Sequence, residues 1–303
     1  MGIERIIKDA ERKLKQEKAA LKSTGPKLAL EKCKGFFASS SLVFDAKIEH
    51  LPDGGKIAVL AVDVLRATAT WTAIGADRPC GIHIRVKDQD GVGFMAPPPS
   101  DGGWVKAGEL NGEPIPGAVM GNSPTEVWQG RFFASWVSFE STNGARAVEQ
   151  AKKVPRSEIF IACLQNIDAV VHAAIEADCN RFVLVAGGFY GSATLEDTVC
   201  AGRILQCLID VGAISMDELD DEAKIAITTA EAFIDDAKLL ATLKDCQVAR
   251  LLREVGREED VDAVITGAGI DPEIWRRMKS TVLRYQEYGG LGVFIPSSQE
   301  EVE

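Results

Sequence analysis

Histidine is scarce in this chain, whose 303 residues include three, at His50, His83 and His172. A zinc site built on several histidines therefore has little to draw on. The cysteines are seven, an odd number, and none lies in a CxxC spacing, which favours reduced thiols over a disulfide framework. No apolar run approaches the roughly 18 residues of a membrane span, and no apolar N-terminal segment marks a secretory signal. We therefore expect a soluble, cytoplasmic protein with no membrane association.

Positive charge is also in short supply. The chain carries 34 Lys and Arg against 45 Asp and Glu, for a formal net charge of −11. Nucleic acid as a partner is disfavoured, because its binding depends on clustered cationic side chains. A small anionic ligand remains compatible if an Arg, helix N-termini and a metal ion form a local positive site. With 46% hydrophobic and 26% charged residues, the composition is that of a globular protein with a packed core.

The two ends of the chain differ from its body. Residues 3–22 carry apolar side chains at helical spacing among charges, which predicts an amphipathic helix that stops near Gly25 and Pro26. We expect residues 1–32 to form an extension that docks on the body or on a partner subunit, so a homo-oligomer stays open. Residues 33–295 are then one α/β domain of one or two lobes, and residues 296–303 a frayed acidic tail.

Within the body, short apolar runs alternate with helical patterns. The runs 57–62, 132–139, 159–163 and 182–186 predict strands, and helical patterns begin near residues 66, 145, 167 and 195. From about residue 215 the pattern is mostly helical. This alternation predicts a layered α/β/α fold with a largely parallel or mixed sheet. Ligands bind beyond the carboxyl ends of the strands in such sheets, so the turns after the strands are the candidate site.

The first such turn holds Asp63, Arg66 and Thr68. A carboxylate at a strand end can bind Mg²⁺ or attack phosphorus, and a nearby Arg can bind phosphate oxygens through two parallel hydrogen bonds. An Asp–Arg salt bridge at the start of a helix explains the same spacing about equally well.

The second turn spans residues 121–126. Ser123, Pro124 and Glu126 occupy the positions of a capping box, which is a sufficient structural explanation for Ser123. Asn122 is left without a local role. Upstream, Glu109 places a carboxylate in a loop, where it is most often just solvated.

The third turn, residues 141–144, offers Thr142, Asn143 and Gly144 at a helix N-terminus. Such hydroxyl, amide and backbone N–H groups can bind an anion. Asn-Gly is also a common solution for an ordinary strand-to-helix turn.

The fourth turn is the richest in chemistry, because a buried strand enters a loop with three glycines and then a helix. Thr194 and Asp197 fit the N-cap and N3 positions of another capping box. Glu196 and Asp197 are both favoured near a helix N-terminus by its dipole, yet one carboxylate is enough for capping. The presence of a second carboxylate therefore favours a role in binding a metal. Cys200, on the first turns of the same helix, is a candidate nucleophile, although such cysteines are more often packed than reactive.

Signatures of other phosphate-handling classes are missing or weak. The sequence has no Cys-x5-Arg phosphate loop and no G-x-x-x-x-G-K-[ST] loop. Asp88, Asp90 and Gly91 match the D-x-D-G pattern of haloacid dehalogenases. Because alternating apolar residues precede them and Asp-Gly is a strong turn, we prefer a hairpin there.

Taken together, VDVLRATAT (62–70), GEL (108–110), GNSP (121–124), STNGARA (141–147), Asn166 and TLEDTVCAG (194–202) resemble the 2-phosphosulfolactate phosphatase family, the ComB proteins of coenzyme M biosynthesis. The resemblance covers about residues 56–210. It implies Mg²⁺-dependent hydrolysis of 2-phospho-3-sulfolactate to 3-sulfolactate and phosphate.

The resemblance also implies site roles. Asp63, Glu109, Glu196 and Asp197 form the expected metal-binding set, with Arg66 and Cys200 as further catalytic candidates. The expected substrate-binding residues are Thr68, Asn122, Ser123, Thr142, Asn143, Gly144 and Asn166. The nucleophile stays open between water, Asp63 and Cys200. Two alternatives also stay open, namely a phosphatase for another small 2-hydroxy acid phosphate and a non-catalytic anion-binding or assembly protein on the same fold.

Overall fold

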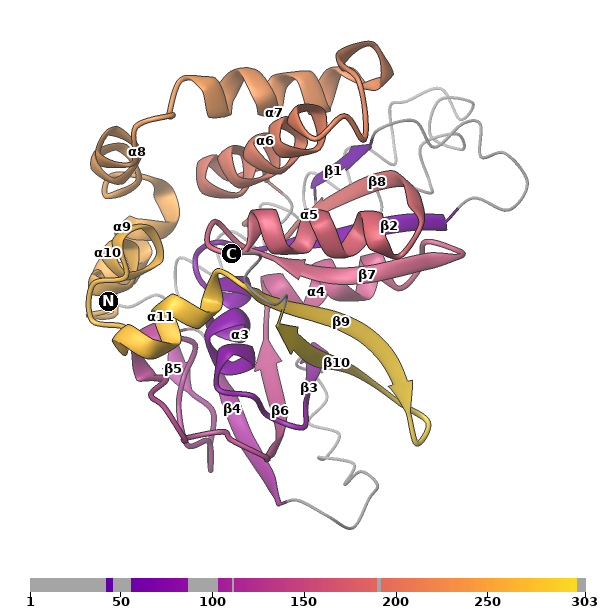
Figure 1. Cartoon of the computed structure of the whole chain (residues 1–303). Helices are drawn as coiled ribbons and strands as arrows, with labels where there is room; N and C mark the ends of the chain where they lie inside the picture. Colours follow the sequence, from indigo (N-terminus) through magenta and orange to yellow (C-terminus); the bar gives the residue numbers. More distant parts are fainter. Residues whose placement is uncertain (1–41, 46–55, 87–102, 111, 190–191, 299–303) are drawn as a thin grey trace, which may run out of the picture.

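The computed structural model describes residues 42–45, 56–86, 103–110, 112–189 and 192–298 (Figure 1). The expected N-terminal helix at 3–22, the hairpin around Asp88–Asp90 and the last residues of the chain lie outside this part. No helix in the described part is both long and apolar enough to cross a membrane.

The centre of the fold is a mixed sheet. Its strands, in the described part of the chain, follow the order β1-β8-β2-β7-β9-β10-β3-β6-β4-β5. They are β1 (Leu42–Asp45), β2 (Lys56–Val62), β3 (Gly81–Val86), β4 (Trp104–Leu110), β5 (Glu113–Pro114), β6 (Trp136–Ser141), β7 (Ser157–Ala162), β8 (Cys179–Ala186), β9 (Thr281–Tyr288) and β10 (Leu291–Ser298).

The sheet contains two parallel blocks of opposite direction. Strands β8, β2 and β7 are parallel to one another, and so are β3, β6 and β4. Between the blocks lies the antiparallel hairpin β9–β10, which pairs with β7 on one side and with β3 on the other. Because these three successive pairings are antiparallel, the second block runs opposite to the first.

Helices cover both faces of the sheet. They are α3 (Ala67–Ala76), α4 (Asn143–Ala151), α5 (Ile167–Glu176), α6 (Leu195–Asp210), α7 (Asp221–Glu231), α8 (Asp236–Leu243), α9 (Gln247–Glu254), α10 (Glu259–Thr266) and α11 (Pro272–Met278), with 3-10 turns η1 (Pro124–Glu126) and η2 (Met216–Glu218). In Figure 1, α5, α6 and α7 stack above the first block, and α8, α9 and α10 form a helical lobe at one end. The layered α/β/α fold expected from the sequence is confirmed.

The alternation of side chains along β2 separates two hydrophobic cores. Ala58, Leu60 and Val62 pack with α5, α6 and α7, whereas Ile57, Val59 and Ala61 pack with α3 and α4. The second core also includes residues of β3, β4 and β6. Helices α3 and α4 therefore pack against strands of both blocks.

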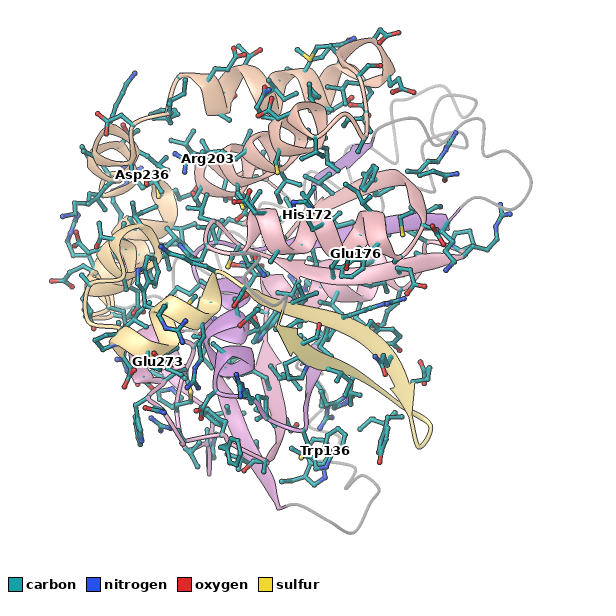
Figure 2. All side chains as sticks on the ribbon, in the orientation of Figure 1. Trp136, His172, Glu176, Arg203, Asp236 and Glu273 are labelled. Atoms are coloured by element: carbon teal, nitrogen blue, oxygen red, sulfur yellow. The ribbon has the colours of Figure 1, made fainter. Side chains whose placement is uncertain are left out.

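The helical lobe is fastened to the body by polar contacts. Arg203 of α6 binds Asp236 of α8 through Nη2 and Oδ1 at 2.8 Å, and Figure 2 shows these side chains between the two helices. Gly202 lets α7 approach α6 closely, because a Cβ there would lie 2.1 Å from the carbonyl oxygen of Ala226. Any side chain at residue 202 would force these helices apart.

Most predicted elements are confirmed, with three corrections. The expected strand 132–139 begins only at Trp136, because residues 132–135 form turns held partly by the Asp77 carboxylate, which accepts the N–H of Phe132 at 2.5 Å. The mostly helical pattern expected from residue 215 is confirmed as far as Met278, but the hairpin β9–β10 that follows the last helix was not expected. Strand β10 also takes up residues 296–298, where a frayed tail was expected.

Candidate functional site

Asp63 lies where the two blocks of the sheet meet. It follows the last residue of β2, and its side-chain Oδ1 accepts the N–H of Ala67 at 3.3 Å. A Cβ on Gly144 would lie 3.0 Å from Asp63 Oδ2, and one on Gly187 2.9 Å. Gly144 lies at the start of α4, after β6, and Gly187 lies at the start of the loop after β8. The turns after three strands from both blocks thus surround one carboxylate.

Two further carboxylates come from the first turn of α6. Both oxygens of Asp197 accept backbone N–H groups, from Val64 at 2.8 Å and from Gly188 at 2.9 Å. Asp197 therefore joins the end of β2 to the glycine loop after β8. Glu196 is also buried, and its Oε2 has no hydrogen-bond partner among the residues that the structure describes. A buried oxygen without a partner is rare in native proteins and marks a place where a ligand can bind.

Burial and mutual repulsion disfavour the charged forms of these carboxyl groups. Burial, and then the charge of Asp197, raise the pKa of Asp63 well above its ordinary value, and Glu196 and Glu109 add to this. The same two causes raise the pKa of Glu196 to about 7. Burial also raises the pKa of Asp197, although its two N–H partners oppose the shift. We call Asp63, Glu196 and Asp197 the carboxylate cluster.

Arg66 forms a salt bridge, but its partner is distant in sequence. Its Nη1 lies 2.6 Å from Oδ2 of Asp260 on α10, and the two side chains are 4% and 0% exposed. The hydroxyl of Ser123 donates to the other oxygen of Asp260. The expected pairing with Asp63 is therefore replaced by a buried Ser123–Asp260–Arg66 network that joins α10 to η1 and α3.

Two predicted capping boxes are wrong. The Ser123 side chain makes no capping bond and binds Asp260, while Glu126 accepts the N–H of Gly121 at 2.9 Å. The Thr194 side chain likewise makes no capping bond to α6, and Asp197 bonds to other loops. In each motif one of the two expected capping side chains, Ser123 or Asp197, hydrogen-bonds to a group outside the motif.

The other predicted site residues lie in different settings. The Thr68 hydroxyl donates to the backbone carbonyl of Asp63 at 2.9 Å, so it shapes the turn. Asn122, beside η1, and Asn143, at the start of α4, each have a buried Oδ1 without a partner in the described part of the chain. Thr142 and Gly144 flank Asn143 at that helix start, where the first N–H groups lack helical partners. These groups fit the predicted anion-binding role, which stays a prediction.

Glu109, Asn166 and Cys200 stand further from the chemistry. Glu109 is half-buried on β4 and accepts the N–H of Gly112 at 2.5 Å. The Asn166 amide bonds three backbone groups of neighbouring segments, so the fold already employs it. The Cys200 thiol is fully buried, and burial raises its pKa well above the ordinary value. A thiol kept protonated and away from solvent lacks the properties of a nucleophile.

The expected set of four metal-binding carboxylates is not a ready-made cage. Within the described residues, no group of three or more His, Cys, Asp or Glu side chains converges in a metal-binding arrangement. Asp197 holds backbone groups with both oxygens, and Glu109 accepts the N–H of Gly112. Asp63 Oδ2 and Glu196 Oε2 remain as the oxygens best placed to bind a cation.

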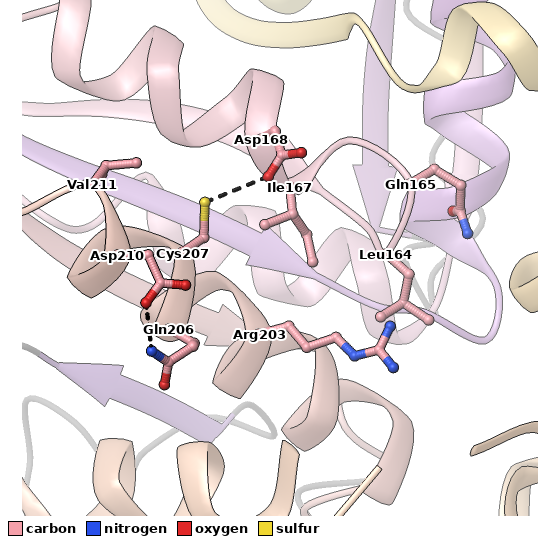
Figure 3. Close-up of a pocket in the computed structure, with 9 residues that line it drawn as sticks. All are labelled: Leu164, Gln165, Ile167, Asp168, Arg203, Gln206, Cys207, Asp210 and Val211. Atoms are coloured by element: carbon pink, nitrogen blue, oxygen red, sulfur yellow. Dashed lines mark hydrogen bonds between the residues drawn. The ribbon is translucent and has the colours of Figure 1, made fainter. Parts of the chain in front are cut away.

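A separate cavity of about 490 Å³ lies between the start of α5 and the middle of α6 (Figure 3). Its polar side chains are paired with one another or with neighbours. The Cys207 thiol donates to Asp168 at 3.5 Å, and Gln206 donates to Asp210 at 2.8 Å. None of the residues that line it belongs to the carboxylate cluster, so we place no chemistry there.

Comparison with known proteins gives a consistent result. The model of a family described as 2-phosphosulpholactate phosphatase matches residues 45–271. A protein of Methanothermobacter thermautotrophicus named 2-phosphosulfolactate phosphatase is 32% identical over 214 residues, which cover 71% of this chain and 84% of that protein. A probable 2-phosphosulfolactate phosphatase of Cyanothece sp. is 31% identical over 219 residues, covering 70% and 86%. Another, from Deinococcus radiodurans, is 29% identical over 213 residues, covering 70% and 83%.

Proposed function

Because the chain belongs to the 2-phosphosulfolactate phosphatase family, we propose that it is a phosphoric monoester hydrolase that converts 2-phospho-3-sulfolactate to 3-sulfolactate and phosphate. We further propose that the reaction requires Mg²⁺, takes place in the cytoplasm and is of the coenzyme M biosynthesis type. The substrate is a small phosphate ester with several negative charges.

The observation that carries this proposal is the carboxylate cluster beside a buried arginine. Three carboxyl groups with raised pKa values gather at the strand ends, and Glu196 Oε2 has no partner among the described residues. A divalent cation would neutralise the repulsion between the carboxylates and would bind the unpaired oxygen of Glu196. Mg²⁺ commonly binds one or two carboxylates and keeps several waters, so Asp63 and Glu196 suffice to hold it.

Each polar group of the site then has a task. Asp63 and Glu196 hold the cation, which supplies neutralisation of the charge on the phosphoryl oxygens. Arg66 and the Asn143 turn bind the phosphoryl oxygens, which keeps the ester in place and stabilises the charge of the transition state. Asp197 keeps the end of β2 and the glycine loop in register through its two N–H partners.

We assign the nucleophile to water. The Cys200 thiol is buried and protonated. Asp63 is held between the Ala67 N–H and two glycines. Water adds to phosphorus while the ester P–O bond breaks, and the leaving oxygen takes up a proton to give the hydroxyl of 3-sulfolactate. Acid quenching during turnover should therefore leave no phosphate bound to the protein, whereas attack by Asp63 would leave an acyl phosphate.

The proposal is tested by phosphate release. The purified protein is given 2-phospho-3-sulfolactate, phosphoglycolate or phospholactate, before and after EDTA treatment and with Mg²⁺ restored. We expect release from 2-phospho-3-sulfolactate to be fastest, to stop with EDTA and to return with Mg²⁺. Faster release from another ester would identify a different 2-hydroxy acid phosphate as the substrate. Release from none of them would favour an anion-binding protein.

A further inference from the structure

We propose that Asp260 is a positioning residue, which holds the Arg66 guanidinium in the orientation that binds the substrate phosphoryl group. The inference rests on the proposed phosphatase function and extends it to the helical lobe. Asp260 belongs to α10, 194 residues from Arg66 along the chain, and no local sequence pattern connects them.

The geometry of the pair leaves Arg66 free to bind an anion. A guanidinium has five N–H donors in a plane. Within the described residues, the one side-chain bond that Arg66 makes is from Nη1 to Oδ2 of Asp260. The remaining donors stay available. Because both side chains are almost fully buried, the attraction between them is screened little by water.

Asp260 is itself held from a second direction. Its Oδ1 accepts the hydroxyl of Ser123, which also lies 2.8 Å from the Thr125 hydroxyl. The carboxylate thus has one oxygen fixed by η1 and the other fixed on Arg66. A carboxylate held in this way fixes the position of the Nη1 end of the guanidinium, and a fixed position favours recognition of phosphate by the other donors of Arg66.

The helix that carries Asp260 is anchored at both ends. Arg257, just before α10, lies 3.2 Å from Oε1 of Glu126 on η1. Near the other end, Gln165 donates to the carbonyl oxygen of Val264. The first contact ties α10 to the turn that holds Ser123, and the second ties it to the turn after β7. The support behind Arg66 is therefore rigid, as orientation of a binding group demands.

The first test compares two aspartates of the same helix. In Asp260→Asn the charge facing Arg66 is lost, and we expect kcat/KM for 2-phospho-3-sulfolactate to fall about 10- to 100-fold, mostly through KM. Binding of inorganic phosphate, measured by calorimetry, should weaken at least about fivefold. The control is Asp262→Asn, which removes an exposed ion pair with Lys244 at 2.7 Å and should change neither value by more than about twofold.

The second test separates positioning from mere stability. Added guanidinium chloride, at tens of millimolar, should partly restore activity to Arg66→Ala, because the free cation can bind Asp260 in the place of the side chain. It should restore nothing to the double variant Arg66→Ala/Asp260→Ala. Equal rescue of both variants would overturn the proposal, since Asp260 would then not be needed to hold the cation.

Other outcomes are equally decisive. An Asp260→Asn protein with a lower Tm but unchanged KM and phosphate affinity would leave Asp260 a purely structural residue. If Asp260→Asn does not fold, Ser123→Ala removes one of the two supports of the carboxylate, and it should raise KM about threefold or more. An unchanged KM and phosphate affinity there would overturn the proposal. If the wild type hydrolyses no ester, the proposed function fails, while phosphate calorimetry on the variants still decides the role of Asp260.

Discussion

The site contains two buried charged groups that are built in opposite ways. In the carboxylate cluster, like charges gather: burial raises the pKa of all three members, and repulsion raises the pKa of Asp63 and Glu196 further. In the Arg66–Asp260 pair, opposite charges meet at 2.6 Å and the remaining carboxylate oxygen is bonded to Ser123. The pair is complete as protein alone, whereas the cluster is stable only when protonated or bound to a cation. In the proposed function, the pair holds the arginine that binds an anion, and the cluster needs a metal to complete it.

The largest expected effect comes from the cluster. Asp63→Asn should lower kcat/KM on the order of a thousandfold, about 4 kcal/mol, because one of the two proposed metal ligands loses its charge. Phosphate release is the measurement. The matched control is Asp77→Asn, also buried, which caps the N–H groups of Gly130 and Phe132 and should lower Tm without lowering kcat. A variant Asp63→Asn with wild-type activity would remove Asp63 from the site.

The carboxylate cluster and the Arg66–Asp260 pair should differ most in how they affect thermal stability when no metal is bound. In EDTA, Asp63→Asn should raise Tm by about 2 to 4 °C, since one repelling charge is gone. Asp260→Asn should lower it by roughly 10 °C, because a buried Arg66 loses its counter-charge at a cost of about 3 kcal/mol. Thermal melts of both variants measure this. Tm shifts of the same sign in the two variants would contradict the view that the cluster destabilises the metal-free protein while the pair stabilises it.

The pH dependence of stability follows from Glu196. Burial and the charge of Asp197 raise its pKa from the ordinary value of 4.5 to about 7 in the folded protein, so folding favours the protonated form. Its contribution to stability is therefore present below about 4.5 and is lost as pH rises through about 7. In EDTA we expect Tm to fall over this interval. Mg²⁺ should then raise Tm by about 3 °C or more above pH 7 and have little effect near pH 5. Glu196→Gln should flatten both trends.

A smaller effect is expected from the glycine beside Asp63. In Gly187→Ala the new Cβ would lie 2.9 Å from Oδ2 of Asp63, so the carboxylate must shift. We expect about a tenfold loss of kcat/KM and a weaker response to Mg²⁺. Gly103→Ala is the control, because its Cβ would meet nothing within 4 Å. Equal activity of the two variants would show that Asp63 tolerates displacement.

The smallest effect should come from Cys200→Ala. The thiol is buried in the core and takes no part in the proposed chemistry, so kcat should change less than about threefold while stability falls by about 1 kcal/mol. Steady-state kinetics and a denaturant melt measure the two quantities. A loss of activity comparable to that of Asp63→Asn would return Cys200 to the list of nucleophiles.

The first half of the fold could be predicted because its signals are local. The runs that became β2, β7 and β8 are short, apolar and followed at once by helical patterns. The hairpin β9–β10 was missed, although Gly289 and Gly290 between two strand-like runs are a known two-residue turn signal, and both have positive φ in the structure. Charged residues in β9 and the helical pattern before it concealed this signal.

For the site, sequence patterns located the turns but not the partners of their side chains. Asp63 and Asp197 come together as expected, because they follow the carboxyl ends of β2 and β8, which are parallel neighbours. Asp260 could not be found, since its contacts to Arg66 and Ser123 span 194 and 137 residues. The capping boxes at Ser123 and Thr194 failed for a related reason, because Ser123 in the first and Asp197 in the second form buried tertiary hydrogen bonds instead.

The position of the β9–β10 hairpin sets an order for folding during synthesis. The hairpin is formed by the last strands of the described chain, yet it lies between the two parallel blocks. A nascent chain can assemble β2, β7 and β8, but the two halves of the sheet have no bridge until the C-terminal strands leave the ribosome. Until then the edges of β7 and β3 are unpaired, which exposes them to aggregation. A chain cut near residue 280 would retain every residue of the carboxylate cluster and still lack the frame that brings them together.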